Sequence, residues 1–277
     1  MSVKIVTDST SDLPEEIVKE LGVTVVPLSV FFGEEAYKDG IEITREEFFK
    51  RLTSGNDVHP HTSQPSVEDF VAVYKELTDK GHEVVSVHVS DKMSGTMNSA
   101  RLAQAEMPDA KITLVDTGLA ALALGLVVKF TAEAAAAGKS FEEVVAVARE
   151  TSEKTHCYFM PATLEFLQKG GRIGKASAIF GGLLSIKPIL TIQDGEVRPF
   201  TKVRTEAKAV ARLLEIATAE GPFAEVGVIH EGEGPSVTLL TNHLKALSDG
   251  PVVSGQIGAV VGVHTGPGVI GMALRKA

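Results

Sequence analysis

The sequence predicts an α/β protein of two domains: a three-layer α/β/α parallel sheet over residues 1–150 and a two-layer α/β mixed sheet over residues 151–277. Two observations lead to this prediction. In the first half, short apolar runs alternate with amphipathic segments that carry helix-capping signals, which is typical of a doubly wound parallel sheet. In the second half, Asp194-Gly195 stands between two extended runs, which indicates a β-hairpin.

The elements of the first half follow one another in a regular order. Strands are expected over 3–9, 23–32, 83–90 and 111–117, because each is a short apolar run. Capping residues and stop signals delimit the helices between them. These signals are Pro14 and Gly22, Thr44 and Glu47, and Ser66 and Gly81. A further helix is expected after Ser94, and two more extend to about Lys154.

The second half is expected to form a mixed sheet with its helices on one face. The hairpin centred on Asp194-Gly195 is followed by a helix over 205–219 and a strand over 225–230. A helix over 235–248, a strand over 252–258 and a terminal apolar run over 268–274 complete the pattern. His264 falls in the glycine-rich stretch "GVHTGPGVIG", where the sequence predicts a loop that could hold a ligand.

Composition limits the classes of function. A net charge of −9 argues against binding to a nucleic-acid backbone, so an anionic ligand would need locally aimed donors. The single cysteine, Cys157, excludes an internal disulfide and is expected to be a buried structural thiol. No signal-peptide pattern is present, and the longest apolar stretch, 119–137, contains Lys129 and Glu133, which favours a buried helix. We expect a cytoplasmic protein.

Hydroxyl-rich segments follow several of the predicted strands, and ligands of open parallel sheets bind at the carboxyl ends of the strands. These segments are 7–10, 61–66, 90–96 and 116–118. Ser94 stands where a helix begins, so its hydroxyl either caps that helix or donates to an anion. The P-loop, the dinucleotide fingerprint and the nucleophile elbow are all absent, and His59 and His61 match no standard metal spacing. We therefore expect no metal and no cofactor.

Taken together, the motifs resemble those of the DegV family, whose best understood members are the fatty-acid-binding FakB subunits of bacterial fatty acid kinase. The resemblance covers essentially the whole chain. It rests on the segments "TDSTSDLP", "VVPLSVFF", "DG" at 39–40, "TSQPS", "VHVSDKMSGTMNSA", "LEFLQKGGRIGK", "IKPILTIQDGEV", "KVR" and "HTGPG".

The resemblance implies a fatty acid held between the two domains. Its carboxylate would be bound by Thr62, Ser94 and His264, with Ser63 and Gly95 beside them. The implied partner is a separate ATP-dependent kinase that makes an acyl phosphate, with Arg172 and Arg204 as docking positions and at most transient membrane contact. The chain itself would be a carrier, not an enzyme. Phe31, Phe32, Ile179, Phe180, Leu183 and Leu184 are candidate residues for the tail slot, or equally for the core.

Two other classes of function remain as alternatives. A serine acyl-ester hydrolase could use Ser94 as nucleophile and His264 as base, and such an enzyme would also bind acyl chains. A regulatory DNA-binding protein would need the basic surface that this acidic composition does not favour.

Overall fold

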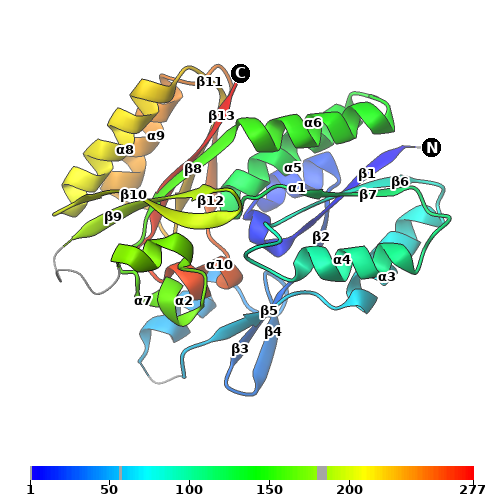
Figure 1. Ribbon diagram of the computed structural model, residues 1–277, viewed down its shortest axis with the longest axis horizontal. Helices are drawn as coiled ribbons and strands as arrows, with labels where there is room; N and C mark the ends of the chain where they lie inside the picture. Colours follow the sequence, from blue (N-terminus) through cyan, green and yellow to red (C-terminus); the bar gives the residue numbers. More distant parts are fainter. Residues whose placement is uncertain (1, 56–57, 180–185) are drawn as a thin grey trace.

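A four-stranded parallel sheet forms the N-terminal half of the computed structural model, which describes residues 2–55, 58–179 and 186–277 (Figure 1). Its strand order is β2-β1-β6-β7, and every neighbouring pair is parallel. The strands are β1 (Val3–Asp8), β2 (Thr24–Val26), β6 (Glu83–His88) and β7 (Ile112–Asp116). The strand order reverses direction beside β1, which places the loops after β1 and β6 next to each other.

Helices cover both faces of this sheet. On one face, α3 and α4 pack against β2, β6 and β7, and on the other face α5 and α6 pack against β1, β6 and β7. The helices of this half are α1 (Glu15–Leu21), α3 (Val67–Thr78), α4 (Thr96–Ala105), α5 (Ala121–Ala136) and α6 (Phe141–Lys154). The predicted three-layer arrangement is therefore confirmed.

The run 23–32 does not form one strand, as the sequence analysis expected, but two. Pro27 lies between them and has no amide hydrogen to donate to a continuing ladder. Only β2 joins the parallel sheet; β3 (Ser29–Phe32) leaves it and forms a small antiparallel sheet of order β4-β3-β5. The other members are β4 (Glu35–Lys38) and β5 (His61–Ser63), and α2 (Arg45–Thr53) connects them.

A six-stranded mixed sheet forms the C-terminal half, with the order β10-β9-β8-β13-β11-β12. All neighbouring pairs are antiparallel except β11 and β12. The strands are β8 (Thr155–Met160), β9 (Lys187–Gln193), β10 (Glu196–Val203), β11 (Phe223–His230), β12 (Val252–Gln256) and β13 (Ile270–Lys276). The predicted hairpin turn is present, with φ of 52° at Asp194 and 76° at Gly195, as a type I′ turn requires.

The outer face of the mixed sheet is covered by α8 (Glu206–Glu220) and α9 (Pro235–Lys245), as predicted. The inner face packs against α5, which therefore contacts both large sheets. Leu122 of α5 sits so close to the sheet that a Cβ at Gly227 or Gly255 would come within 2.4 or 2.8 Å of its side chain. The predicted domain boundary near residue 150 falls in the last turn of α6 and stays a prediction.

Short helices between residues 160 and 266 were not predicted. They are α7 (Glu165–Lys169), the 3-10 helix η2 (Gly174–Ile179) and α10 (Ala259–Thr265). The sequence analysis expected His264 in a loop, but it lies in the last turn of α10. The loop signal was misleading because Gly266, with φ of 71°, ends this helix and the Gly-Pro-Gly stretch follows it.

Two general properties follow from the elements. Across the described ranges, no helix is long and apolar enough to cross a membrane. Most of the apolar stretch 119–137 forms α5, and most side chains of this helix are buried between the two sheets. The chain is thus an α/β protein with a parallel four-stranded sheet and a mixed six-stranded sheet.

Candidate ligand-binding pocket

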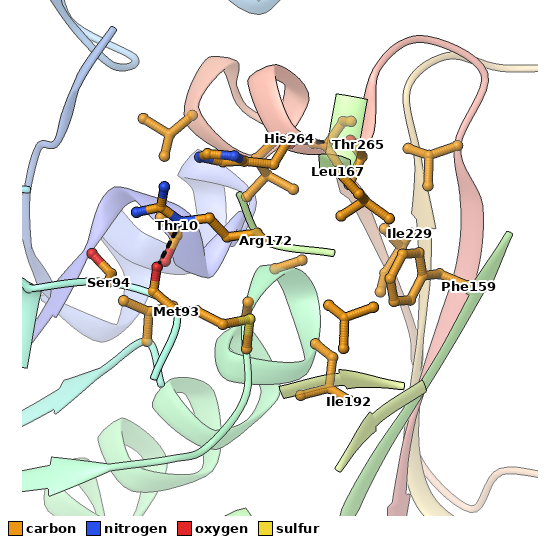
Figure 2. Close-up of a pocket in the computed structure, with 18 of the residues that line it drawn as sticks. Thr10, Met93, Ser94, Phe159, Leu167, Arg172, Ile192, Ile229, His264 and Thr265 are labelled. Carbon is orange, nitrogen blue, oxygen red and sulfur yellow. Dashed lines mark hydrogen bonds between the residues drawn. The ribbon is translucent and has the colours of Figure 1, made fainter. Parts of the chain in front are cut away.

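A deep pocket lies where the two large sheets and α10 meet, with about 790 Å³ of empty space including the part open to solvent. One end of the pocket carries polar side chains and the remainder is apolar (Figure 2). The polar members are Thr10, Thr62, Ser94, Arg172, His264 and Thr265.

The apolar wall comes mainly from the mixed sheet. In Figure 2, Phe159, Ile192 and Ile229 face the cavity on the side opposite Ser94. Cys157 also lines this wall, and burial raises the pKa of its thiol to about 12, which makes it an inert apolar group at neutral pH. Such a wall can hold a long hydrocarbon chain but offers no partner for a polar one.

Thr62 and His264 meet at the polar end, although 202 positions separate them. The distance from Thr62 Oγ1 to His264 Nε2 is 3.0 Å, which is a hydrogen bond. Burial, followed by the positive charges of Arg172 and His59, lowers the pKa of His264 to about 4. The imidazole is therefore neutral at pH 7 and can donate through one nitrogen only.

The surroundings of His264 indicate which nitrogen donates. Nδ1 is buried and has no hydrogen-bond partner among the described residues. Leaving a lone pair of Nδ1 without a partner costs less free energy than leaving an N–H group there without one. The ring hydrogen therefore belongs on Nε2, facing Thr62 Oγ1. Thr62 then keeps its own hydrogen free for a ligand. Gly170 packs against this ring: a Cβ at position 170 would lie 2.2 Å from Nδ1.

Ser94 contacts the start of α4 and also lines the pocket, so both roles considered from the sequence stay open. Its Oγ accepts from the backbone N–H of Thr96 at 3.3 Å and lies 2.8 Å from Thr96 Oγ1, and its side chain also lines the pocket with Thr62 and His264. Thr96 is fully buried, so its hydroxyl requires an acceptor. When Thr96 donates to Ser94, the Ser94 hydrogen is left to point into the pocket.

Ser63 and Gly95, the two neighbours in the predicted site, are not among the described pocket-lining residues. Ser63 donates to the carbonyl of Gln64 at 3.3 Å, because alternate residues of β5 face opposite sides. Gly95 packs on the same glutamine: a Cβ at position 95 would be 3.1 Å from Gln64 Cδ. Gly95 therefore lets the segment that carries Ser94 approach the segment that carries Thr62.

The two arginines that were predicted as docking positions differ in location. Arg172 is half-buried in the pocket wall, where Nε donates to the carbonyl of Met93 at 2.9 Å and Nη1 to that of Gly170 at 2.8 Å. In Figure 2 its guanidinium lies between Ser94 and His264. Arg204 is exposed in the turn between β10 and α8. No local pattern placed Arg172 in the pocket, because its position depends on contacts with the carbonyl groups of Met93 and Gly170.

A Ser-His-Asp arrangement lies beside the pocket but is closed to any substrate. Asp8 Oδ2 is 2.9 Å from His88 Nδ1, and His88 Nε2 is 2.6 Å from Ser86 Oγ. All three side chains are fully buried. Asp8 also accepts from the hydroxyl and the amide of Thr10, a pocket residue, so this network fixes part of the pocket wall.

The aromatic candidates for the tail slot lie elsewhere. Phe31 stacks on His61 with ring centroids 4.8 Å apart, and Phe32 is buried in the core against Phe48. Ile179 packs against the core without lining the pocket. Phe180, Leu183 and Leu184 lie outside the described residues.

Taken as a whole, the lining of this pocket suits an elongated apolar molecule with one polar, acceptor-rich end. Two neutral hydroxyls, one of them held by the imidazole of His264, and one guanidinium are donors suited to a carboxylate. Within the described ranges, no group of three or more histidine, cysteine or acidic side chains is arranged to hold a metal ion. The fold and the pocket thus define a two-sheet α/β protein with an amphipathic pocket where the sheets meet.

Comparison with known proteins gives the family. The family model described as "Uncharacterised protein, DegV family" matches residues 2–277, and the chain belongs to this family. A DegV domain-containing protein of Streptomyces coelicolor is 39% identical over 281 residues, covering 99% of this chain and 98% of that protein.

Solved structures agree with this assignment. A DegV family protein from Thermus thermophilus, described as binding fatty acid, is 39% identical with a TM-score of 0.94 over 100% of both chains. A stearic acid-binding protein from Eubacterium ventriosum is 30% identical with a TM-score of 0.89, over 99% of this chain and 98% of that one. Fatty acid binding is thus found among DegV family proteins.

Proposed function

We propose that this protein binds one long-chain fatty acid in the pocket and presents its carboxylate to a separate ATP-dependent kinase that forms an acyl phosphate. One observation carries the binding half of this proposal: an apolar cavity ends in a cluster of hydrogen-bond donors drawn from distant parts of the chain. Relatives that share the whole fold are described as binding fatty acids.

The carboxylate is held in our proposal by Thr62, Ser94 and His264. Thr62 donates its hydroxyl hydrogen to one carboxylate oxygen while His264 Nε2 donates to Thr62. Ser94 donates to the carboxylate while it accepts from Thr96. The guanidinium of Arg172 adds a positive charge near the same point, which favours the ionised acid over an ester or an alcohol.

Organic extraction of the purified protein followed by mass spectrometry tests the binding. The expected result is about one equivalent of a long-chain fatty acid, or saturable binding of stearate after delipidation. Release of a different amphiphile, together with no stearate binding, would overturn the proposal.

The kinase half is tested separately. We propose Arg172 and Arg204 as positions that face the kinase, and only Arg204 lies away from the pocket, which makes it the cleaner test. Arg204→Glu should weaken kinase-dependent acyl-phosphate formation and leave stearate affinity unchanged. Lys139→Glu makes the same charge change in the exposed turn between α5 and α6 and should affect neither quantity. Acyl-phosphate formation by the purified chain with ATP and Mg²⁺ alone would contradict the division of labour.

The hydrolase alternative has less support in the geometry. His264 Nε2 is engaged by Thr62, and Nδ1 faces Gly170, so neither nitrogen is bonded to Ser94 in the described residues. A base with a pKa of about 4 accepts a proton poorly at neutral pH. A fluorophosphonate probe should therefore leave Ser94 unlabelled, and stoichiometric labelling would favour the hydrolase.

A further inference from the structure

The helix that carries His264 is held at its other end by two carboxylates from distant parts of the chain. Asp12 Oδ1 accepts from the Gly258 amide at 2.8 Å, and Asp39 Oδ1 accepts from the Ala259 amide at 3.0 Å. These are the amides at the start of α10, which have no partner within the helix. Asp12 and Asp39 are 2% and 6% exposed, so water does not compete for them.

Two sequence motifs meet at this point. Asp12 comes from "TDSTSDLP" after β1, and Asp39 from the "DG" after β4. Burial raises the pKa of Asp39, and the polar groups of Ser9, Ala259 and Val260 around it act in the opposite direction. The approach is close: a Cβ at Gly258 would lie 3.0 Å from Asp12 Oδ1 and 3.3 Å from Asp39 Oδ2.

The small antiparallel sheet holds both ends of α10. The amide of Asp39 donates to the carbonyl of Leu28 at 2.9 Å, and Thr62 of β5 pairs with Val30 of β3. Asp39 contacts the start of α10, and Thr62 contacts His264 near its end. Both are therefore attached to the same short segment, 28–30. A helix of seven residues spans roughly 10 Å, and a rigid sheet sets the separation of its two attachment points.

The middle of α10 is also fixed. Gly262 lies on the rings of Phe48 and Phe49 in α2, where a Cβ would come within 2.6 Å of Phe48 and 2.9 Å of Phe49. With its middle pressed against α2, the helix can still slide or rotate about its axis. The hydrogen bonds at its two ends oppose that movement, in addition to the packing of the helix against α7, α2 and β3.

We propose that Asp12 and Asp39 are positioning residues for the ligand site: by accepting from the first amides of α10, they fix its position along its axis and hold His264 against Thr62. The inference rests on the proposed fatty acid site, but the placement of His264 is measurable without ligand. Asp12 and Asp39 do not contact the ligand in this proposal. They act by fixing the position of His264, about one helix length away.

Asp12 offers a matched pair of substitutions. Its φ of 49° is left-handed, a conformation that both asparagine and glycine accept. Its Oδ2 has no hydrogen-bond partner among the described residues, so Asp12→Asn keeps the acceptor for Gly258 and places the new amide group where no bond is lost. Asp12→Gly removes the acceptor. Burial raises the pKa of Asp12 well above its usual value. Neither variant has an ionisable group at position 12, and only the asparagine variant keeps the acceptor for the Gly258 amide.

Two quantities are measured on delipidated protein: stearate affinity, and the pKa of His264 by NMR titration of its imidazole signals. Asp12→Asn should stay within about threefold of wild-type affinity, whereas Asp12→Gly should bind about tenfold more weakly. In Asp12→Gly the pKa of His264 should rise from about 4 toward 6.5 as the ring leaves its buried position between Thr62, Gly170, Arg172 and His59. Thr205→Ala removes the cap of the remote helix α8 and should lower the melting temperature without changing either quantity.

The outcomes separate the possibilities. A folded Asp12→Gly with wild-type affinity and an unchanged His264 pKa would overturn the inference, as would equal losses in the asparagine and glycine variants. If Asp12→Gly does not fold, Gly258→Ala takes its place, because its Cβ pushes both carboxylates away at a φ of −77° that alanine adopts freely. That variant should reproduce the glycine variant's two changes, and a wild-type result would refute the inference. Failure of wild-type protein to bind stearate would refute the proposed function alone.

Discussion

Gly170→Ala is expected to disable the ligand site although it changes a residue with ordinary helical backbone angles. Position 170 has φ of −76° and ψ of −6°, where alanine is normally favoured over glycine by about 0.5–1 kcal/mol. The new methyl group would lie 2.2 Å from His264 Nδ1 and 3.1 Å from the Phe166 carbonyl oxygen. Unstrained contacts need about 3.5 Å, so the ring has to move by about 1 Å.

That movement sets the expected magnitudes. A displacement of about 1 Å breaks the 3.0 Å bond between Thr62 and His264. Overpacking costs about 1–3 kcal/mol, and the backbone preference offsets part of it, so the free energy of unfolding should fall by about 1–2 kcal/mol. Without His264 to orient it, the Thr62 hydroxyl no longer donates well to the carboxylate, and loss of that charge-assisted bond should weaken stearate binding about ten- to a hundredfold.

The assay is a double-mutant cycle with His264→Ala, measured by denaturant unfolding and by stearate binding. Without the ring, Gly170→Ala should be neutral or stabilising, which corresponds to a coupling energy of about 1–3 kcal/mol. Gly232→Ala is the control, because nothing lies within 4 Å of its Cβ position and its φ is not left-handed. The reasoning is refuted if Gly170→Ala behaves like wild type, or if it has the same effect with and without His264.

Three further outcomes are expected. Ser94→Ala should bind stearate about ten- to a hundredfold more weakly in calorimetry and lose about 1 kcal/mol of stability by leaving Thr96 unpaired. Ser140→Ala, which removes the cap of α6, should change stability alone. The pKa of His264 is about 4 in the folded protein, below its usual 6.5, so its contribution to stability is complete above pH 6.5 and is lost as the pH falls through 4. The contribution amounts to about 3 kcal/mol, and denaturant titrations of His264→Gln should show a flatter pH dependence of the unfolding free energy. Cys157 should react with a thiol reagent far more slowly than a free thiol, and more slowly still with stearate bound; labelling at the free-thiol rate would contradict its burial.

Much of the fold was predictable because local signals and tertiary structure agree. The Ser66 capping box is formed with Asp69, and Thr44 accepts from the amide of Glu47. The Asp194-Gly195 turn has the two positive φ angles that these residues favour. Where a local pattern of this kind exists, a single sequence is enough.

The elements that were missed are those that tertiary contacts impose. The segment of α10 contains valines and Gly262, residues of low helix propensity, and has no side-chain cap of its own. Its cap comes from Asp12 and Asp39, more than 200 positions away, which no local pattern reveals. The same holds for Arg172, whose place in the pocket depends on contacts with Met93 and Gly170. The resemblance to a family supplied Thr62, Ser94 and His264 together, whereas their separate patterns could not.

The position of α5 between the two large sheets has a consequence for how fast a ligand can enter and leave. Rotating the two sheets apart would break the packing of Leu122 against Gly227 and Gly255. It would also separate the buried Lys129 Nζ from Glu225 Oε2, which lie 2.8 Å apart. Such an opening would also expose the buried apolar side chains of α5 to water, so a hinge at α5 would open rarely. We therefore expect an acyl chain to exchange through local movement at the rim near Arg172 and α7, and dissociation rates to respond to substitutions there rather than to cross-links between α5 and the mixed sheet.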